Sequence, residues 1–341
     1  MSKPLYSIVR FAEADEKSRS IWDAFIKVSI NGTFLQSRRF LNYHPKDRFR
    51  DHSVVFYNDK NCLVAVCPAC ETEDNGKKIF YSHKGSTYGG LILSEEIYKA
   101  KHIIPLIQNL EKYLISCGFN EIYLKITPDI FSIERTSLLE YALYYNGYIE
   151  YKELNPFIEY SSYKDNIISN FSQGKRSHVN KCIREHMETH VINSDEDVGI
   201  YYDILCENLS KYNLKPVHTI NELLDFKNSR LKNECQFLGT YLKNEMVAGG
   251  MVFFFEKTKT AHTQYLSAKA DYLKLSPVTF LYYYLIDEMR KRGYQRLSWG
   301  ICTEDFGRYL NEGLISSKED YGSTYSNNLT YYKKLGGGCL T

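Results

Sequence analysis

The sequence predicts an α/β (α+β) protein of two similar domains in tandem, each with a mixed, mainly antiparallel sheet flanked by helices. The chain has 341 residues, which suits about two domains of ordinary size. One order of elements can be read twice along it: a strand, two helices, a three-strand meander, a helix and a strand. The block 117–122, in which a glycine separates a helix from a strand, aligns with 292–297. A repeat of this length indicates duplicated domains rather than a solenoid.

The first domain is expected over residues 1–155. Its predicted elements are a strand at 5–11, helices at 18–29 and 36–43, strands at 52–57, 62–67 and 78–82, a helix at 95–117 and a strand at 121–126. Trp22 and Phe25, at helical spacing, predict the apolar face of the first helix. Ser94 is placed to cap the last helix and Gly118 to end it.

The second domain is expected over residues 156–335. Its predicted elements are a strand at 189–193, helices at 197–212 and 219–231, strands at 236–241, 247–255 and 260–267, a helix at 276–292 and a strand at 295–300. Lys243 and Asn244 form the predicted hairpin turn, and Gly293 ends the last helix. The domains are expected to join at Asn155–Pro156, and the glycine-rich tail, 336–341, is expected to be flexible.

Composition narrows the functional classes. The net charge of +2, from 43 basic and 41 acidic residues, argues against broad electrostatic binding of nucleic acid, so no DNA partner is expected. No apolar stretch approaches the roughly 20 residues of a transmembrane helix. Nine cysteines without framework spacing indicate reduced thiols and a cytoplasmic location. Cys67 and Cys70 have the spacing of a zinc or redox pair, but the sequence has no second such cysteine pair, so no metal is expected.

Tyrosine is unusually frequent, with 30 residues. One interpretation is a strand-rich structure, because strands favour aromatic residues. The other is a set of stacking platforms for a sugar or another extended substrate. Composition leaves both open.

The order of elements is that of the GNAT acetyltransferase fold, and it matches neither a Rossmann unit nor a TIM barrel. Several blocks further resemble the FemAB-like tandem GNAT proteins, close to the CelD-type acyltransferases of polysaccharide biosynthesis. These blocks are TFLQSRRFL at 33–41 continuing to 49, SHKGSTYGG at 82–90, KPVHT at 215–219 with 222–223, AHTQYLS at 261–267, and WGICTED at 299–305 with 310–314 and 318–319.

The resemblance implies an acyltransferase that carries an acyl group from acetyl-CoA or another acyl-CoA to an amine or hydroxyl. The acceptor would be a small molecule, or a glycan or lipid-linked precursor of the cell envelope or of a polysaccharide. The loop at 267–275, however, lacks the glycines of the usual GNAT signature for coenzyme A. Two alternatives therefore stay open: a FemABX-type peptidoglycan aminoacyltransferase that uses aminoacyl-tRNA, and a non-catalytic protein that binds a glycan or lipid precursor.

Acyl transfer to an amine needs a base and a place for the leaving group. His262 is the first candidate for the base, because histidine titrates near neutrality and this one is expected to share a strand face with Gln264. Glu304 is the second candidate, as base or as the group that orients His262. The competing interpretations are a structural histidine and a carboxylate that caps a turn.

A donor anion is expected at the helix that begins at Ser276, where backbone N–H groups and the helix dipole favour negative charge. Lys269 and Lys274 would add charge, although an ordinary capped helix is the competing interpretation. Arg176 belongs to a basic helical run, 175–184, that suits phosphate or simply faces solvent.

Further substrate contacts are expected from polar and aromatic side chains in both halves. In the second half these are His218, Gln264, Tyr265, Asn311, Lys318 and Glu319. In the first half they are His83, Tyr88 and Gly89, where the glycine would let backbone approach a ligand. A capping box explains Thr219 and Glu222 but leaves His218 unexplained.

Overall fold

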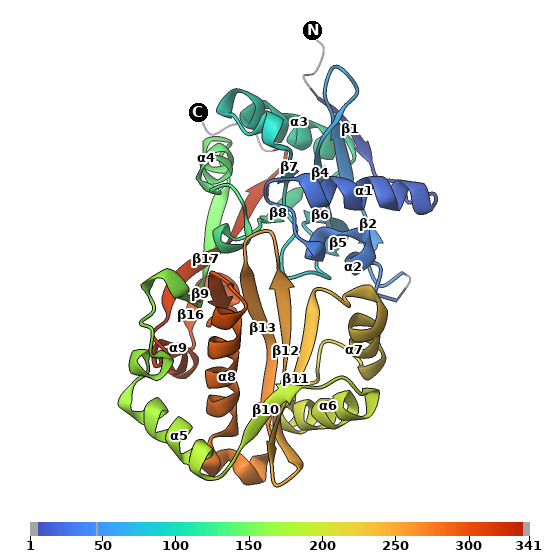
Figure 1. The fold of residues 1–341 in the computed structure, drawn as a ribbon. Coiled ribbons are helices and arrows are strands. Elements are labelled where there is room, and N and C mark those ends of the chain that lie inside the picture. The colour runs from blue at the N-terminus through green and yellow to red at the C-terminus, as the bar shows by residue number, and fades with distance from the viewer. Residues whose placement is uncertain (1–5, 46, 337–341) are drawn as a thin grey trace. The chain divides into compact units, whose positions relative to one another are not determined.

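The computed structural model describes residues 6–45 and 47–336 and divides the chain into two units (Figure 1). Unit 1 takes the chain up to Glu153, the segment Asp305–Arg308 and the chain from Asn327 on. Unit 2 takes Leu154–Glu304 and Tyr309–Ser326. Apart from Gly336, the tail that was expected to be flexible lies outside the described residues.

Unit 1 contains helices α1 to α4 and strands β1 to β8, and it is completed by the end of the chain. Its helices are α1 (Glu16–Val28), α2 (Arg38–Leu41), α3 (Ala100–Ser116) and α4 (Ser137–Tyr145). Its strands are β1 (Ser7–Arg10), β2 (Arg50–Asp51), β3 (Val54–Tyr57), β4 (Leu63–Cys67), β5 (Cys70–Asp74), β6 (Lys77–Tyr81), β7 (Ile92–Leu93), β8 (Glu121–Lys125) and most of β17 (Thr324–Lys334). The strand β9 (Ile149–Glu159) begins in unit 1 and ends in unit 2.

Unit 2 contains the remaining elements. Its helices are α5 (Gln173–Arg184), α6 (Asp195–Ser210), α7 (Ile220–Asp225, continued by a π-helical turn, Phe226–Arg230), α8 (Pro277–Lys291) and α9 (Glu312–Glu319). Its further strands are β10 (Glu188–Val191), β11 (Cys235–Leu242), β12 (Glu245–Phe255), β13 (Thr260–Ala268), β14 (Arg296–Ser298), β15 (Thr303–Glu304) and β16 (Tyr309–Leu310).

The predicted duplication is visible in the pairing of the strands. Unit 2 has the order β10-β11-β12-β13-β14-β9, in which β13 and β14 are parallel and the other neighbours antiparallel. In unit 1, β1-β3-β4 and β5-β6-β8-β17 repeat this order, with β6 and β8 as the parallel pair. Pro68 and Ala69 separate β4 from β5, where unit 2 has the single strand β12. The mixed, mainly antiparallel tandem fold is therefore confirmed.

The last strand of each unit comes from the other half of the sequence. The strand β9 follows α4 but pairs with β14 of unit 2, and β17 follows α9 but pairs with β8 of unit 1. The expected junction at Asn155–Pro156 thus lies within the strand β9.

The structure confirms the helix ends and the turn that glycine and capping residues predicted in the two halves. Gly118 and Gly293 both adopt left-handed backbone (φ 77° and 76°) directly after the C-caps of α3 and α8. Lys243 and Asn244 also have positive φ, as the tight turn between β11 and β12 requires. Thr219 caps α7 in a capping box with Glu222.

Some predicted elements differ. The helix expected at 95–117 begins as a 3-10 turn, Glu95–Ile97, and only continues as α3 from Ala100, because Tyr98 leaves helical geometry. Ser94 precedes that turn but makes no side-chain capping bond. The sequence analysis also did not predict α4, β9, β17 or α9.

The helices of unit 2 cover opposite faces of its sheet (Figure 1). The apolar side chains of α8, such as Leu281 and Leu285, pack against Val252 and Ala261. Helices α6 and α7 lie on the other face, where Tyr201 of α6 contacts β12 at Gly249. No helix within residues 6–45 and 47–336 is both long and apolar enough to cross a membrane.

Candidate functional site

The leading candidate site lies where the parallel strands β13 and β14 part. Their pairing runs from Thr260 opposite Arg296 to His262 opposite Ser298 and stops there, while β13 continues to Ala268. His262 is therefore the last residue of β13 that is held beside β14. In the part of β13 that follows, backbone pairing no longer closes this side of the strand.

A buried polar chain fixes the His262 ring. The Ser298 hydroxyl donates to Asn155 Oδ1 at 3.2 Å and lies 3.1 Å from His262 Nδ1. When that hydroxyl hydrogen is directed at Asn155, the Ser298 oxygen accepts from the tautomer of His262 that carries its hydrogen on Nδ1, and Nε2 then has the lone pair. Ser298 and Asn155 are fully buried. The arrangement orients one imidazole nitrogen as a proton acceptor.

Burial sets the charge of this histidine. It lowers the pKa of His262 to about 4, so the ring is neutral at pH 7. A neutral imidazole can take a proton, but its cation would be short-lived in this environment.

A β-bulge changes which side chains accompany His262. Met251 of β12 pairs with Tyr265 and Val252 with Thr263, so Gln264 is the extra residue between them. His262, opposite Phe253, shares its face with Tyr265, opposite Met251. Gln264 is the bulged residue and its side chain hydrogen-bonds that of Tyr265, so its place beside His262 stays a prediction.

His218 joins the same face from the segment before α7. Its Nδ1 lies 2.8 Å from the Tyr265 hydroxyl, and the His218 side chain is buried. Burial raises the pKa of Tyr265 to about 12, so this hydroxyl stays protonated. The structure thus brings His262, Tyr265 and His218 onto the face covered by α6 and α7. Their roles in binding stay predictions.

Glu304 is not part of this hydrogen-bonded group. It is exposed at the end of β15, opposite Tyr309. The described hydrogen bonds and ion pairs give its side chain no partner, which fits neither the turn cap nor a fixed base.

The expected anion site at the start of α8 is poorly equipped. Pro277 has no N–H, and the N–H of Thr279 donates to the Ser276 carbonyl at 2.9 Å. Of the first three helical positions this leaves the N–H of Val278, too few to cradle a pyrophosphate. Ser276 adopts left-handed backbone (φ 58°) and its hydroxyl makes no capping bond. The start of α8 by itself therefore offers little support for the pyrophosphate of coenzyme A.

The basic residues near this helix are mostly engaged or exposed. Lys269 forms an ion pair with Glu245 at 2.7 Å, whereas Lys274 is exposed. Arg176 lies on the exposed side of α5 together with Arg184. Helix α5 carries four basic residues and no acidic one, and Lys181 reaches the Lys274 carbonyl at 3.2 Å.

The predicted contacts from α9 serve the unit itself. Asn311 is the N-cap of α9 and accepts from the N–H of Leu314 at 3.0 Å. Lys318 is buried, donates to the Tyr282 hydroxyl, and lies 4.1 Å from the centre of that ring and 5.4 Å from that of Trp299. Glu319 accepts from the Tyr325 hydroxyl. These contacts explain the three side chains without a ligand.

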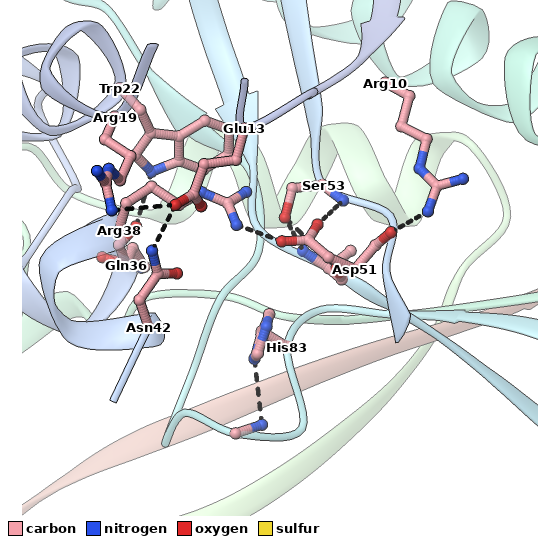
Figure 2. A network of polar contacts seen from close by, with 12 residues as sticks. Arg10, Glu13, Arg19, Trp22, Gln36, Arg38, Asn42, Asp51, Ser53 and His83 are labelled. Carbon is pink, nitrogen blue, oxygen red and sulfur yellow. Dashed lines mark hydrogen bonds and ion pairs between the residues drawn. The ribbon is translucent and has the colours of Figure 1, made fainter. Parts of the chain in front are cut away.

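In unit 1, His83 lines a polar cavity of about 450 Å³ (Figure 2). The cavity is also lined by Glu13, Arg38, Asn42 and Asp51. Burial lowers the pKa of His83 to about 4, and its Nδ1 accepts from the N–H of Gly85 at 3.2 Å. A polar ligand group that entered this cavity would meet a neutral histidine.

Arg38 is the buried cation of this cavity, with 1% of its surface exposed. Its guanidinium packs against the rings of Phe11 and Trp22, 4.3 and 4.4 Å from their centres, and these two rings contact each other with centres 4.8 Å apart. Its Nη1 donates to the Asp51 carboxylate. Burial alone would raise the pKa of Asp51, but Arg38 and the N–H of Ser53 outweigh it and hold this pKa below its usual value.

Tyr88 and Gly89 do not line the cavity. Tyr88 is buried against Phe131, with ring centres 5.9 Å apart. The backbone of Gly89 donates to Lys125 and accepts from Gln36, each at 2.9 Å. A Cβ at Gly89 would lie 3.1 Å from the carbonyl carbon of Ser82, so the close approach that glycine permits is to the unit's own backbone.

The sequence reading did not select Ser298, Asn155, Arg38 or Asp51. Asn155 was read as a domain junction, and Ser298 as an ordinary strand residue. The run TFLQSRRFL at 33–41 was a signal for Arg38, since it belongs to the blocks that carry the family resemblance.

Comparisons with known proteins concern the fold. No family model and no curated protein sequence matches the chain. Among solved structures, the chain is similar to FemX, with a TM-score of 0.68 and 10% identity, over 96% of this chain and 97% of that one. It is similar to L-PGS from Bacillus licheniformis, with a TM-score of 0.60 and 14% identity, over 94% and 92%.

A third solved structure has the tandem organisation in its name. This is the tandem GNAT protein from the clavulanic acid biosynthesis pathway, with a TM-score of 0.56 and 9% identity, over 98% of this chain and 100% of that one. The chain therefore has the tandem GNAT fold of FemAB-like proteins, as its sequence blocks indicated.

Proposed function

We propose that this protein is an acyltransferase that acts on an amine or hydroxyl of a cell-envelope or polysaccharide precursor. The observation that carries the proposal is the oriented imidazole of His262 at the point where β13 and β14 part. The fold shared with FemX and with L-PGS supports the reaction class. A solved structure from Agrobacterium fabrum, named as the C-terminal domain of a "Putative Lysylphosphatidylglycerol Synthetase", is similar as well, with a TM-score of 0.58 and 10% identity.

In the proposed reaction the acceptor nitrogen or oxygen attacks the carbonyl carbon of the donor. A bond forms between them, and the acceptor's proton passes to His262 Nε2. The carbonyl then re-forms as the bond to the leaving group breaks, and the same proton passes to the leaving group. Because burial disfavours the His262 cation, the ring returns its proton readily. Ser298 and Asn155 act as positioning residues that hold the ring.

One observation favours aminoacyl-tRNA over acyl-CoA as the donor. The start of α8 offers too few backbone N–H groups for a pyrophosphate, whereas α5 presents exposed Arg176 and Arg184 without any acidic residue of its own. A phosphodiester backbone suits such a helix. If acetyl-CoA or another acyl-CoA is the donor instead, the protein should bind that acyl-CoA saturably.

Donor identity is tested by calorimetry and by transfer assays with the full chain. Saturable binding of acetyl-CoA would favour acyl-CoA. Transfer of a labelled amino acid from charged tRNA to an envelope extract, abolished by ribonuclease, would favour the tRNA donor. Transfer from neither donor, with retained binding of a glycan or lipid precursor, would contradict the enzymatic proposal.

The role of His262 is tested by His262→Gln. We expect turnover to fall by about 100-fold or more, the usual contribution of a general base. Ser298→Ala should lower it by less, because the ring remains but is no longer held. The matched control is His190→Ala, an exposed histidine on β10 of the same unit. Undiminished turnover of His262→Gln would remove His262 from the role.

A further inference from the structure

A second cavity in unit 1, of about 530 Å³, has an aromatic lining that no step of the proposed reaction uses. It lies between α4, the start of β9 and β17, and its volume is in the range of small-molecule sites, about 300–1,000 Å³. Its lining side chains include Tyr141, Tyr144, Tyr148, Tyr331, Glu140 and Glu150.

Two of these rings are unusually open to solvent. Tyr144 is 74% exposed and Tyr141 54% exposed, three residues apart on one face of α4. A tyrosine ring combines an apolar face with a polar hydroxyl, so exposed tyrosines suit a ligand that has both apolar and polar surface. Tyr148 and Tyr331 are buried behind them and fix the floor.

The polar groups of the cavity are mainly hydrogen-bond acceptors. Glu150 accepts from the Tyr331 hydroxyl at 2.5 Å and forms an ion pair with Lys152 at 2.9 Å. Glu140 accepts from the Thr136 hydroxyl. Each carboxylate has further lone pairs for ligand hydroxyl groups. None of the described lining residues is lysine, arginine or histidine, so an anionic ligand would be repelled.

The two carboxylates of the cavity differ in charge balance. Lys152 already neutralises Glu150, whereas the described ion pairs give Glu140 no cationic partner. An organic cation could therefore pair with Glu140 alone, while a neutral ligand with many hydroxyl groups can donate to both carboxylates.

We propose that this cavity binds a neutral saccharide. One face of a sugar ring, with its C–H groups, lies on Tyr144 and Tyr141, and its hydroxyl groups donate to Glu140 and Glu150. This inference goes beyond the proposed acyl transfer, because it concerns a different cavity. The tyrosine-rich composition thus has a stacking use on α4, in addition to the strand preference of aromatic residues.

The test is isothermal titration of the full chain with three neutral probes, tetra-N-acetylchitotetraose, cellotetraose and maltotetraose, and one anionic probe, trigalacturonate. We expect saturable binding of at least one neutral probe and at least about tenfold weaker binding of trigalacturonate. Tyr144→Ala should weaken the neutral probe by about tenfold, the effect of about 1.4 kcal/mol of stacking. The matched control, Tyr212→Ala, removes an equally exposed ring from unit 2 and should leave binding within about twofold.

Glu140→Gln provides a second variant that keeps the shape of the cavity. It should retain the neutral probe and reduce the discrimination against trigalacturonate. The proposal is overturned if none of the neutral probes binds at about 10 mM. It is equally overturned if Tyr144→Ala binds as the wild type does, or if tetramethylammonium binds in a Tyr144-dependent way and the saccharides do not. None of these three results would bear on the donor assays or on His262.

Discussion

Arg38 is a buried arginine that packs against two aromatic rings, and its role in stability can be separated from its charge. Its Nε and Nη2 are buried without a hydrogen-bond partner among residues 6–45 and 47–336. Such donors are costly to bury, while the flat guanidinium packs against the rings of Phe11 and Trp22.

Replacing Arg38 with methionine should therefore be tolerated better than replacing it with alanine. We expect Arg38→Ala to lower the free energy of unfolding by about 3 kcal/mol, since it leaves a cavity. Arg38→Met should lower it by less than about 1.5 kcal/mol, because it keeps the volume. Urea unfolding measures both. Equal losses would show that the ion pair with Asp51, not packing, is what Arg38 supplies.

His83 makes stability depend on pH. Burial lowers its pKa to about 4, so the unfolded chain, with a histidine pKa near 6.5, binds a proton that the folded chain refuses. Stability is therefore full above about pH 6.5 and is lost as the pH falls toward 4. The loss from His83 is on the order of 3 kcal/mol.

The pH effect can be measured as the urea midpoint at several pH values between 7.5 and 4.5. The urea midpoint of His83→Gln should fall less steeply with decreasing pH than that of the wild type. The m-value, the dependence of the unfolding free energy on urea at one pH, should be the same for both proteins. His262 shifts in the same direction, so some decline will remain in the variant. Parallel curves for the two proteins would contradict the assignment.

At the residue level, sequence reasoning found His262 but not what holds it. Histidine is recognisable because its chemistry suits a base, whereas Ser298 and Asn155 are 143 positions apart and become partners only through tertiary structure. The bulge at Gln264 could not be read either. It depends on the pairing of β13 with β12, not on the alternation of residues along β13.

Ser276 shows how one backbone conformation limits a helix start. Its φ of 58° is in the left-handed region, which glycine adopts without strain. Ser276→Gly should therefore raise the free energy of unfolding by about 1 kcal/mol, and Ser276→Val should lower it. If the hydroxyl held a donor anion, Ser276→Gly would also raise the KM for the donor; an unchanged KM is expected.

Asn311 offers a similar separation at the start of α9. Asn311→Ala removes the acceptor for the N–H of Leu314 and should lower the free energy of unfolding by about 1 kcal/mol. Asn311→Ser, which can still cap, should stay within about 0.5 kcal/mol of the wild type. The KM for the acceptor substrate should not change in Asn311→Ser. A selective rise in KM would restore the substrate contact that the sequence predicted.

Elements with strong local signals were predictable, and those that depend on pairing were not. Helix α8 was delimited by its proline and by Gly293, and the β11–β12 hairpin by its turn. The strand β17 carries Ser326, Asn327 and Asn328, which break the apolar alternation of a typical strand. It is a strand because it pairs with β8.

At the scale of the molecule, β9 and β17, each of which pairs with a strand from the other half of the sequence, determine which fragments can fold. Leu329 and Tyr331 of β17 belong to the core of unit 1, together with Ile122 and Leu124 of β8. A fragment that ends at residue 155 would lack this strand and expose the edge of β8.

We therefore expect the fragment 1–155 to be unfolded or aggregated. The same fragment with residues 327–336 attached through a flexible linker should recover a cooperative unfolding transition. Circular dichroism and urea unfolding would check this. A cooperative transition in 1–155 alone would show that β17 is dispensable to unit 1. Sequence reasoning foresaw the duplication but assigned each copy a continuous stretch, because pattern repeats carry no information on which copy a strand joins.

The position of β17 also determines the order in which the two units can complete their sheets during synthesis. The ribosome makes β1 to β8 before β17, so β8 lacks its partner strand until all of unit 2 has been synthesised. Unit 2, complete at Ser326, has all its strands before unit 1 does. The half that is synthesised first is thus the half that matures last, and a nascent chain stalled before Asn327 would present an open β8 edge to chaperones.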